Sequence, residues 1–214
     1  MTMTDNQIET TTVVEIDWRT LSALATVSAS ASTDSARPVL LAIHLYTEGG
    51  RLVADATDSY TLGRLSVESD VTGLDALIPA KWLVSSLKSL KPAKVARVTS
   101  YSSSGKLVTL SVSSGMATLS DGSATFTTEL ISGTFPSVSQ LIPEPSAYVF
   151  EKASFNLRIL TRMNDILPSS SAKVSNTWTC VSMPAQKPSI WTRSEFVGAD
   201  KVDGLLLVMP VRVN

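Results

Sequence analysis

The same order of elements occurs three times along this chain, and the repeat limits the folds that the chain can adopt. Each repeat, called a unit below, opens with a short strand and a helix, at 12–17 and 18–28, then 77–78 and 80–90, and finally 148–152 and 155–167. Runs typical of strands follow each helix: 39–47, 51–56 and 60–66; then 95–101, 106–112, 116–120 and 124–131; and finally 174–183, 189–194 and 205–213. The second unit thus carries one extra strand, and the pattern as a whole predicts an α+β fold made of repeated strand-helix-three-strand units.

A proline-rich stretch separates the third unit from the first two. Residues 134–145 contain three prolines, and proline cannot donate the hydrogen bond that a central strand requires. We therefore expect an extended linker there, between a complete domain of two units at 12–143 and a shortened domain of one unit at 144–214. The polar residues 1–11 are expected to form a disordered tail.

The second helix lies in a strongly basic stretch. Residues 79–97 contain no acidic residue, and their cations are Lys81, Lys88, Lys91, Lys94 and Arg97. Leucines recur at helical spacing on one face of this helix, while Lys81 and Lys88 fall nearly opposite. Two interpretations are open: a solvated helix face, which is what most charge runs are, or a face that offers cations to an extended anion.

The amino-acid composition and net charge limit the classes of protein to which this chain can belong. Hydrophobic residues make up 43% and charged residues 17% of the 214 residues, and the net charge is -1. This is the composition of a globular protein, and any nucleic-acid contact must come from a local patch. One cysteine, Cys180, indicates a reducing compartment. The sequence has neither a signal peptide nor an apolar run of membrane-spanning length, so we expect a cytoplasmic protein with no membrane contact.

The residue patterns of enzymes are missing from the sequence. One histidine, His44, and one cysteine cannot supply the usual zinc ligands, and there is neither a nucleophile elbow nor a glycine-rich phosphate loop. Asp55 and Asp58 are close in sequence, but we predict that one lies in a strand and the other at a turn. We therefore predict no enzyme activity, no catalytic residue, no metal and no cofactor.

Several ordered motifs resemble the bacterial beta sliding clamp family, the processivity factors of DNA polymerase III. The motifs are RPVLL at 37–41, EGGRL at 48–52, ATDSYTL at 56–62, LIPAK at 77–81, GTFP at 133–136, LIP at 141–143 and LVMPVRV at 207–213. Their order along the chain makes the set far more specific than any one motif. The resemblance implies a DNA clamp fold, in which sheets face outward and helices line a ring around duplex DNA.

The resemblance also implies two sites. Contacts to DNA phosphates, sequence-independent and weak enough for sliding, would come from Lys81, Lys88, Lys91, Arg158 and Arg162, with Arg19 as a weaker candidate. The DNA polymerase and the clamp loader would each insert a short hydrophobic peptide into a second site. Its residues would be Thr57, Ser59, Tyr60, Thr61, Leu62, Pro136, Leu141, Val208, Met209, Pro210, Val211 and Arg212.

The chain also departs from the family. Bacterial clamp subunits are much longer, and Thr61 stands where the family often has arginine. Half of the last domain is missing, which would leave an apolar face of Leu157, Leu160 and Met163 uncovered. Such a compact variant would suit a phage genome. Alternative functions are a clamp-like protein that sequesters polymerase without encircling DNA, and a structural β-rich virion protein.

The number of units predicts the assembly. Clamp rings contain six domains of two units each, so four copies of this three-unit chain would close a ring. The third units of two chains would then build one shared domain. A ring of three chains is the second choice and an assembly of two chains the third. With 22.8 kDa per chain, the masses are 91.2, 68.4 and 45.6 kDa for four, three and two chains.

Overall fold

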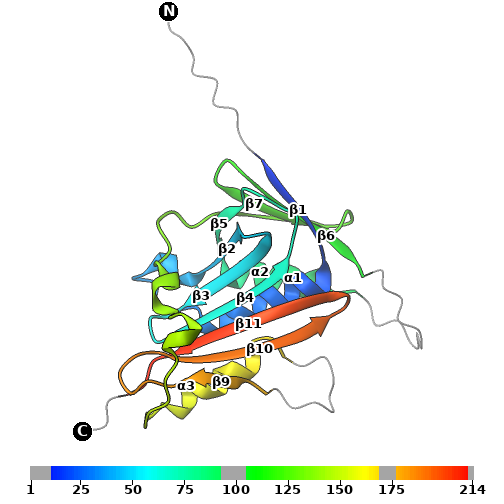
Figure 1. The fold of residues 1–214 in the computed structure, drawn as a ribbon. Coiled ribbons are helices and arrows are strands. Elements are labelled where there is room, and N and C mark those ends of the chain that lie inside the picture. Colours follow the sequence, from blue (N-terminus) through cyan, green and yellow to red (C-terminus); the bar gives the residue numbers. More distant parts are fainter. Residues whose placement is uncertain (1–10, 93–104, 169–176, 212–214) are drawn as a thin grey trace, which may run out of the picture.

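The computed structural model describes residues 11–92, 105–168 and 177–211 (Figure 1). Within these residues the strands form two sheets. A four-stranded sheet has the order β1 (Thr12–Asp17), β6 (Leu107–Ser113), β7 (Met116–Ser120), β8 (Thr125–Glu129). A seven-stranded sheet has the order β5 (Asp75–Pro79), β2 (Ala42–Glu48), β3 (Arg51–Thr57), β4 (Thr61–Glu68), β11 (Asp200–Val208), β10 (Ser189–Val197), β9 (Thr179–Ser182).

The helices of the described residues are short. The α-helices are α1 (Trp18–Leu24), α2 (Ala80–Ser89) and α3 (Leu157–Arg162). The 3-10 segments are η1 (Ala25–Ser30), η2 (Pro38–Leu41), η3 (Val138–Leu141), η4 (Pro145–Ala147) and η5 (Met163–Asp165). α1 and α2 lie behind the strands in Figure 1. The architecture is therefore sheets with a layer of helices, as the repeat predicts.

The first two units exchange their opening strands. β1 of the first unit pairs antiparallel with β6 of the second, and β5 of the second pairs antiparallel with β2 of the first. α1 and α2 follow these strands directly and contact each other, and Trp18 Nε1 donates a hydrogen bond to the Leu87 carbonyl at 2.8 Å. Neither unit therefore has a complete sheet or a covered helix without the other.

The third unit continues the sheet of the first. β11 pairs antiparallel with β4, from Asp203 opposite Ser66 to Val208 opposite Thr61, and β10 and β9 follow outward. On the helix side, Ile166 and Leu167 are buried in the same hydrophobic core as α1 and α2. The third unit is thus joined to the first by main-chain pairing on one side and by core packing on the other.

Two apolar clusters hold the layers together. The larger one lies between the sheets and the helices and includes Leu21, Leu83, Leu87 and Leu110. The smaller one contains Leu62, Leu77, Leu207 and Ile190 together with Phe135 and Val138. Because Phe135 and Val138 belong to the stretch predicted to be a linker, that stretch is packed onto the sheet and does not hang free.

Several predicted elements are shorter than the sequence indicates. Residues 38–41 form η2 before β2, because Pro38 at the start of this segment has no N–H for strand pairing. The predicted helix 18–28 turns into η1 at Ala25, and helix 155–167 is reduced to α3 and η5. Residues 148–152 do not form a strand: the structure shows an isolated bridge between Phe150 and Met183.

Some predictions fall outside the described residues. These are the tail at 1–10, the strand at 95–101 with the cations Lys94 and Arg97, the first part of the strand at 174–183, and the end of the chain with Arg212. The predicted apolar face of the third helix is only partly uncovered. Met163 is buried, whereas 75% of Leu157 is exposed.

Candidate nucleic-acid and peptide-binding surfaces

The basic face of α2 is exposed as its periodicity predicts. Leu83 and Leu87 are buried in the core, whereas Lys81 and Lys88 are exposed on the other side of the helix. Lys88 lies in the last turn, where a cation interacts favourably with the helix dipole. Lys91 is exposed just after the helix. These lysines, called the basic face below, present exposed positive charges on the helix side of the molecule.

The basic face adjoins the third unit. Lys88 and Lys91 line a hollow of about 460 Å³ that is also bordered by Trp18 and Ala29 of the first unit and by Asp165 of η5. Cations of the second unit therefore lie beside the helical segments of both other units. The structure brings together the helix faces that sequence analysis assigned separately.

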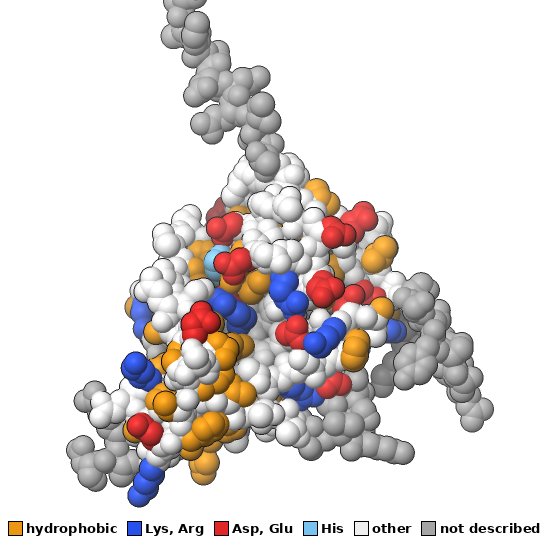
Figure 2. Space-filling view, in the orientation of Figure 1, with side chains coloured by type: hydrophobic (Ala, Val, Ile, Leu, Met, Phe, Trp, Pro, Cys, Tyr) orange, Lys and Arg blue, Asp and Glu red, His pale blue; other side chains and the backbone are white. Residues whose placement is uncertain are grey.

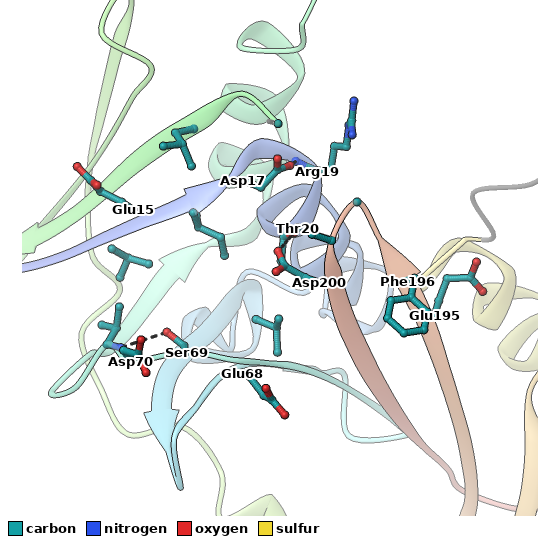
Figure 3. A pocket seen from close by; sticks show the side chains of 18 of the residues that line it. Glu15, Asp17, Arg19, Thr20, Glu68, Ser69, Asp70, Glu195, Phe196 and Asp200 are labelled. Atoms are coloured by element: carbon teal, nitrogen blue, oxygen red, sulfur yellow. Dashed lines mark hydrogen bonds between the residues drawn. The ribbon is translucent and has the colours of Figure 1, made fainter. Parts of the chain in front are cut away.

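Arg19 has a different environment from these lysines. It lines a wide cleft of about 1390 Å³ between β1, the end of β4 and the β10–β11 turn. The carboxylates of this cleft are Glu15, Asp17, Glu68, Asp70, Glu195 and Asp200 (Figure 3). Figure 3 shows Arg19 projecting from α1 near Asp17 and away from Glu68 and Asp70. A phosphate approaching Arg19 would therefore meet carboxylates as well.

The two arginines of α3 also differ. Arg158 is exposed, one helical turn before Arg162. Arg162 is partly buried: its Nη1 donates to Asp58 Oδ2 at 2.6 Å, and its Nε donates to the Ala29 carbonyl at 2.8 Å. The charge of Arg162 is thus already paired with a carboxylate. Periodicity places Arg162 on a polar face but gives no sign of this partner.

Asp58 organises the turn between β3 and β4. Its Oδ1 accepts hydrogen bonds from the backbone N–H groups of Tyr60 and Thr61, at 2.9 and 2.8 Å, while Oδ2 accepts from Arg162. Ser59 takes a positive φ of 78°, a conformation that such a turn stabilises. Burial raises the pKa of Asp58, but the hydrogen bonds from Arg162, Thr61 and Tyr60 outweigh burial and lower the pKa below its ordinary value.

The predicted peptide-site residues come together around this turn. Met209 N donates to the Tyr60 carbonyl at 2.9 Å, and Leu207 pairs with Leu62 across β11 and β4. Leu62 also packs with Val138 of the linker. The turn, the linker and the C-terminal segment therefore meet at one place, although they are far apart in sequence.

Exposure divides these residues into a floor and a rim. Thr57, Thr61, Leu62 and Val208 are buried, and Met209 and Pro210 are half-buried. Ser59, Tyr60, Pro136, Leu141 and Val211 are exposed. Figure 2 shows hydrophobic side chains gathering over the part of the surface formed by the linker and the third unit. Apolar side chains are therefore available there for a partner.

Two residues of this region were missed from sequence. Asp58 fixes the turn, and Arg37 Nη1 donates to Ser59 Oγ at 3.0 Å. The signal for Asp58 was present, because an aspartate that opens a short polar turn often accepts hydrogen bonds from the following backbone N–H groups. For Arg37 no local pattern exists, since its partner lies 22 residues away.

A comparison with family models gives the family. Residues 16–137, more than half of the chain, match the model of the central domain of the DNA polymerase III beta subunit. The chain belongs to this family. Members of the beta subunit family are sliding clamps, which are processivity factors without catalysis of their own. No curated protein sequence matches the chain.

Solved structures of sliding clamps have the same fold. The sliding clamp of Pseudomonas aeruginosa superposes with a TM-score of 0.69 at 15% identity, over 94% of this chain and 66% of that chain. The Bartonella birtlesii clamp bound to griselimycin gives 0.69 at 18% identity, over 94% and 66%. The Thermotoga maritima beta subunit gives 0.68 at 13%, over 95% and 66%. This beta-family chain thus spans about two thirds of their length.

Among the residues that the structure describes, no group of three His, Cys, Asp or Glu side chains is placed to hold a metal. Asp55 and Asp58 are each paired with a separate arginine, Arg64 and Arg162 respectively. Within the described ranges, no helix is long and apolar enough to cross a membrane.

Proposed function

We propose that this protein is a DNA sliding clamp that encircles duplex DNA and tethers a replicative DNA polymerase to it. The observation that carries the proposal is the basic face of α2, Lys81, Lys88 and Lys91, on the helix side of a clamp fold. It is an accessory subunit, and the chemistry belongs to the polymerase.

Weak contacts suit this function. The basic face consists of exposed lysines, whose contacts with phosphates are individually small and are screened by salt. A net charge of -1 gives no bulk attraction to DNA. Retention therefore comes from the closed ring, and the lysines keep the duplex centred without holding it at one position. Arg158 adds an exposed cation, whereas Arg162 contributes less because it is paired with Asp58, and Arg19 because it borders a cleft lined by carboxylates.

The region around the β3–β4 turn is the proposed site for the polymerase and the clamp loader. Exposed Tyr60, Leu141 and Val211 would contact a short hydrophobic peptide, above a floor formed by Leu62 and Val208. The half-buried Met209 adds a flexible side chain that can repack against different peptides. Griselimycin, the ligand of the Bartonella birtlesii clamp, is a probe for this site.

Charge reversal on the basic face tests the proposal. We expect Lys81→Glu with Lys88→Glu to reduce polymerase processivity at physiological salt. Because each lost phosphate contact lowers the slope of log affinity against log salt by about 0.9, the slope should fall by about 2. The matched control is Lys187→Glu with Lys201→Glu, which changes the net charge equally at exposed positions outside the helix layer.

The outcomes separate the candidate functions. Loss of processivity in the basic-face variant alone supports the DNA-lining assignment. Equal processivity in both variants and in the wild type would refute that assignment. Peptide binding without any retention on DNA would favour the alternative of a clamp-like protein that sequesters polymerase.

A further inference from the structure

The first two units show how a unit of this protein is completed. In each, the opening strand leaves its own unit and pairs antiparallel with the first described strand after the helix of the other unit: β1 with β6, and β5 with β2. The helix begins at the next residue, Trp18 or Ala80. α1 and α2 then cover each other. A unit therefore needs a second unit to receive its opening strand, to supply a strand in return and to cover its helix.

The third unit has an opening segment, a helix and a strand that could receive another opening segment, but the described residues contain no partner unit for it. Residues 148–152 precede α3 but are separated from it by residues 153–156, whereas β1 and β5 lead directly into their helices; β9 is the first described strand after α3. β9 is also the last strand of the seven-stranded sheet, at the position that β2 would hold without β5. The structure describes no strand beyond it. Both an opening segment and a receiving edge are therefore available.

The opening segment makes a different contact within its own chain. Glu151 N donates to the Met183 carbonyl at 2.8 Å, and Met183 N donates to the Val149 carbonyl at 2.7 Å, which is a parallel bridge. The opening strands of the other units pair antiparallel instead. Met183 also lies just past the end of β9, and no strand among the described residues pairs with the outer edge of Thr179–Val181.

Apolar side chains remain exposed in the opening segment and at the start of α3. The exposed fractions are 45% for Val149, 65% for Phe150 and 75% for Leu157 at the start of α3. The corresponding strands β1 and β5 place residues such as Val14 and Ile78 in the core. Soluble proteins seldom leave such neighbouring apolar side chains exposed unless a partner covers them.

We infer that the third unit pairs with the third unit of a second copy of this chain, residues 148–152 of each chain forming an antiparallel strand along β9 of the other. The second copy is the occupant that fits, because it supplies together an opening segment held in its own chain by a single parallel bridge, a helix with an exposed apolar start, and a β9 edge that no described strand pairs with. Such an exchange is reciprocal about a twofold axis, as in most protein dimers. The pair would bury Leu157 of both chains.

The pair of chains has consequences for the ring. It contains two complete domains and one shared domain, and β8, the last strand of each four-stranded sheet, lies at both outer ends. Two such pairs, joined through their β8 edges, give a closed assembly of four chains. Only this closure rests on the proposed function; the pair itself does not require DNA.

Cysteine cross-linking tests the exchange directly. The native Cys180 lies in β9, and single cysteines at each of the residues 148–152 scan the opening segment. In an antiparallel exchange at least one of them faces Cys180 of the other chain, and oxidation gives a band of 45.6 kDa, twice 22.8 kDa, on a non-reducing gel. Adding Cys180→Ser should abolish the band. Oxidation at alkaline pH helps, because burial raises the pKa of the Cys180 thiol.

Cysteines at Phe150 and Met183 together, in a chain with Cys180→Ser, are the matched control for the chain on its own, because the parallel bridge joins these two residues. Cross-links within one chain between these two cysteines, without a 45.6 kDa band for any of the five scanning cysteines, would overturn the exchange.

The mass in solution provides a second test. Leu157→Glu should halve the mass of the assembly, from 91.2 to 45.6 kDa, without loss of secondary structure, because Leu157 is exposed in the single chain. Phe196→Glu, at a side chain with a similar exposed fraction of 66%, should leave the mass unchanged. A wild-type mass of 22.8 or 68.4 kDa would contradict the pair. Cross-linking without retention on DNA would retain the pair and refute the clamp function.

Discussion

Replacing Arg162 separates its two possible roles. As a DNA contact, Arg162 would affect retention on DNA, whereas its geometry predicts an effect on the β3–β4 turn. Arg162→Gln removes a charged hydrogen bond of 2.6 Å to Asp58 and the donation to the Ala29 carbonyl. We expect lower stability and weaker peptide binding, with little change in DNA retention.

The expected loss of stability in Arg162→Gln follows from the burial of the Arg162–Asp58 ion pair. The exposed fractions of the side chains are 33% for Arg162 and 16% for Asp58, so the pair lies between a surface ion pair and a fully buried one. Hydrogen bonds to charged groups contribute about 1.5–3 kcal/mol, and a value of about 2 kcal/mol is expected here. If the loosened turn spends most of its time in other conformations, affinity for a polymerase peptide falls about tenfold.

The effect should depend on pH. The pKa of Asp58 is lowered in the folded protein, so its interaction stabilises the fold above the pKa of the unfolded chain, about 3.9. This contribution is lost as the pH falls through the lower folded pKa. The stability difference between wild type and Arg162→Gln should therefore be full at pH 7 and shrink in strongly acidic solution.

Urea denaturation and fluorescence polarisation with a labelled polymerase peptide measure the two effects. Arg158→Gln, one turn earlier on α3 and exposed, is the matched control and should change neither stability nor peptide affinity. If Arg162→Gln kept both properties and lost DNA retention, the assignment to the turn would be wrong and Arg162 would be a DNA contact.

Two further predictions concern the sheet and the C-terminal segment. Asp55 is 1% exposed and accepts from Arg64 Nε and Nη2 at 2.9 and 2.8 Å, so Arg64→Met leaves a buried charge and should cost about 3–5 kcal/mol, measured by urea denaturation. Asp55→Asn in the same chain should recover part of this loss; a further loss of similar size would contradict the ion-pair explanation. Deleting residues from Met209 onward should abolish peptide binding while β11 remains intact, and a folded truncation that still bound the peptide would refute the proposed site.

Local patterns predicted the parts of the fold that depend on neighbouring residues. The leucine spacing of α2 fixed which face is buried, because helical periodicity relates Leu83 to Leu87 directly. The ordered motifs predicted the clamp fold. They also assigned the turn at Tyr60 and the segment at Met209 to one site, and in the structure these two segments are hydrogen-bonded.

Pairings between distant residues could not be predicted in this way. Helical periodicity places Arg162 on a polar face, but it cannot show that Asp58, 104 residues away, pairs with the guanidinium. The strand predicted at 148–152 has the apolar side chains of a strand, but a strand forms only where an edge receives it, and sequence alone does not specify that edge. β11 likewise joins β4 across most of the chain.

Retention on DNA before and after linearisation tests the central claim most directly. The protein is loaded by the cognate clamp loader onto nicked circular DNA at moderate salt, separated from free protein by gel filtration, and the circle is then cut once by a restriction enzyme. A clamp that encircles DNA stays on the circle and slides off the free ends after the cut. Equal retention on the circular and the cut DNA, or no retention on either, would contradict encirclement.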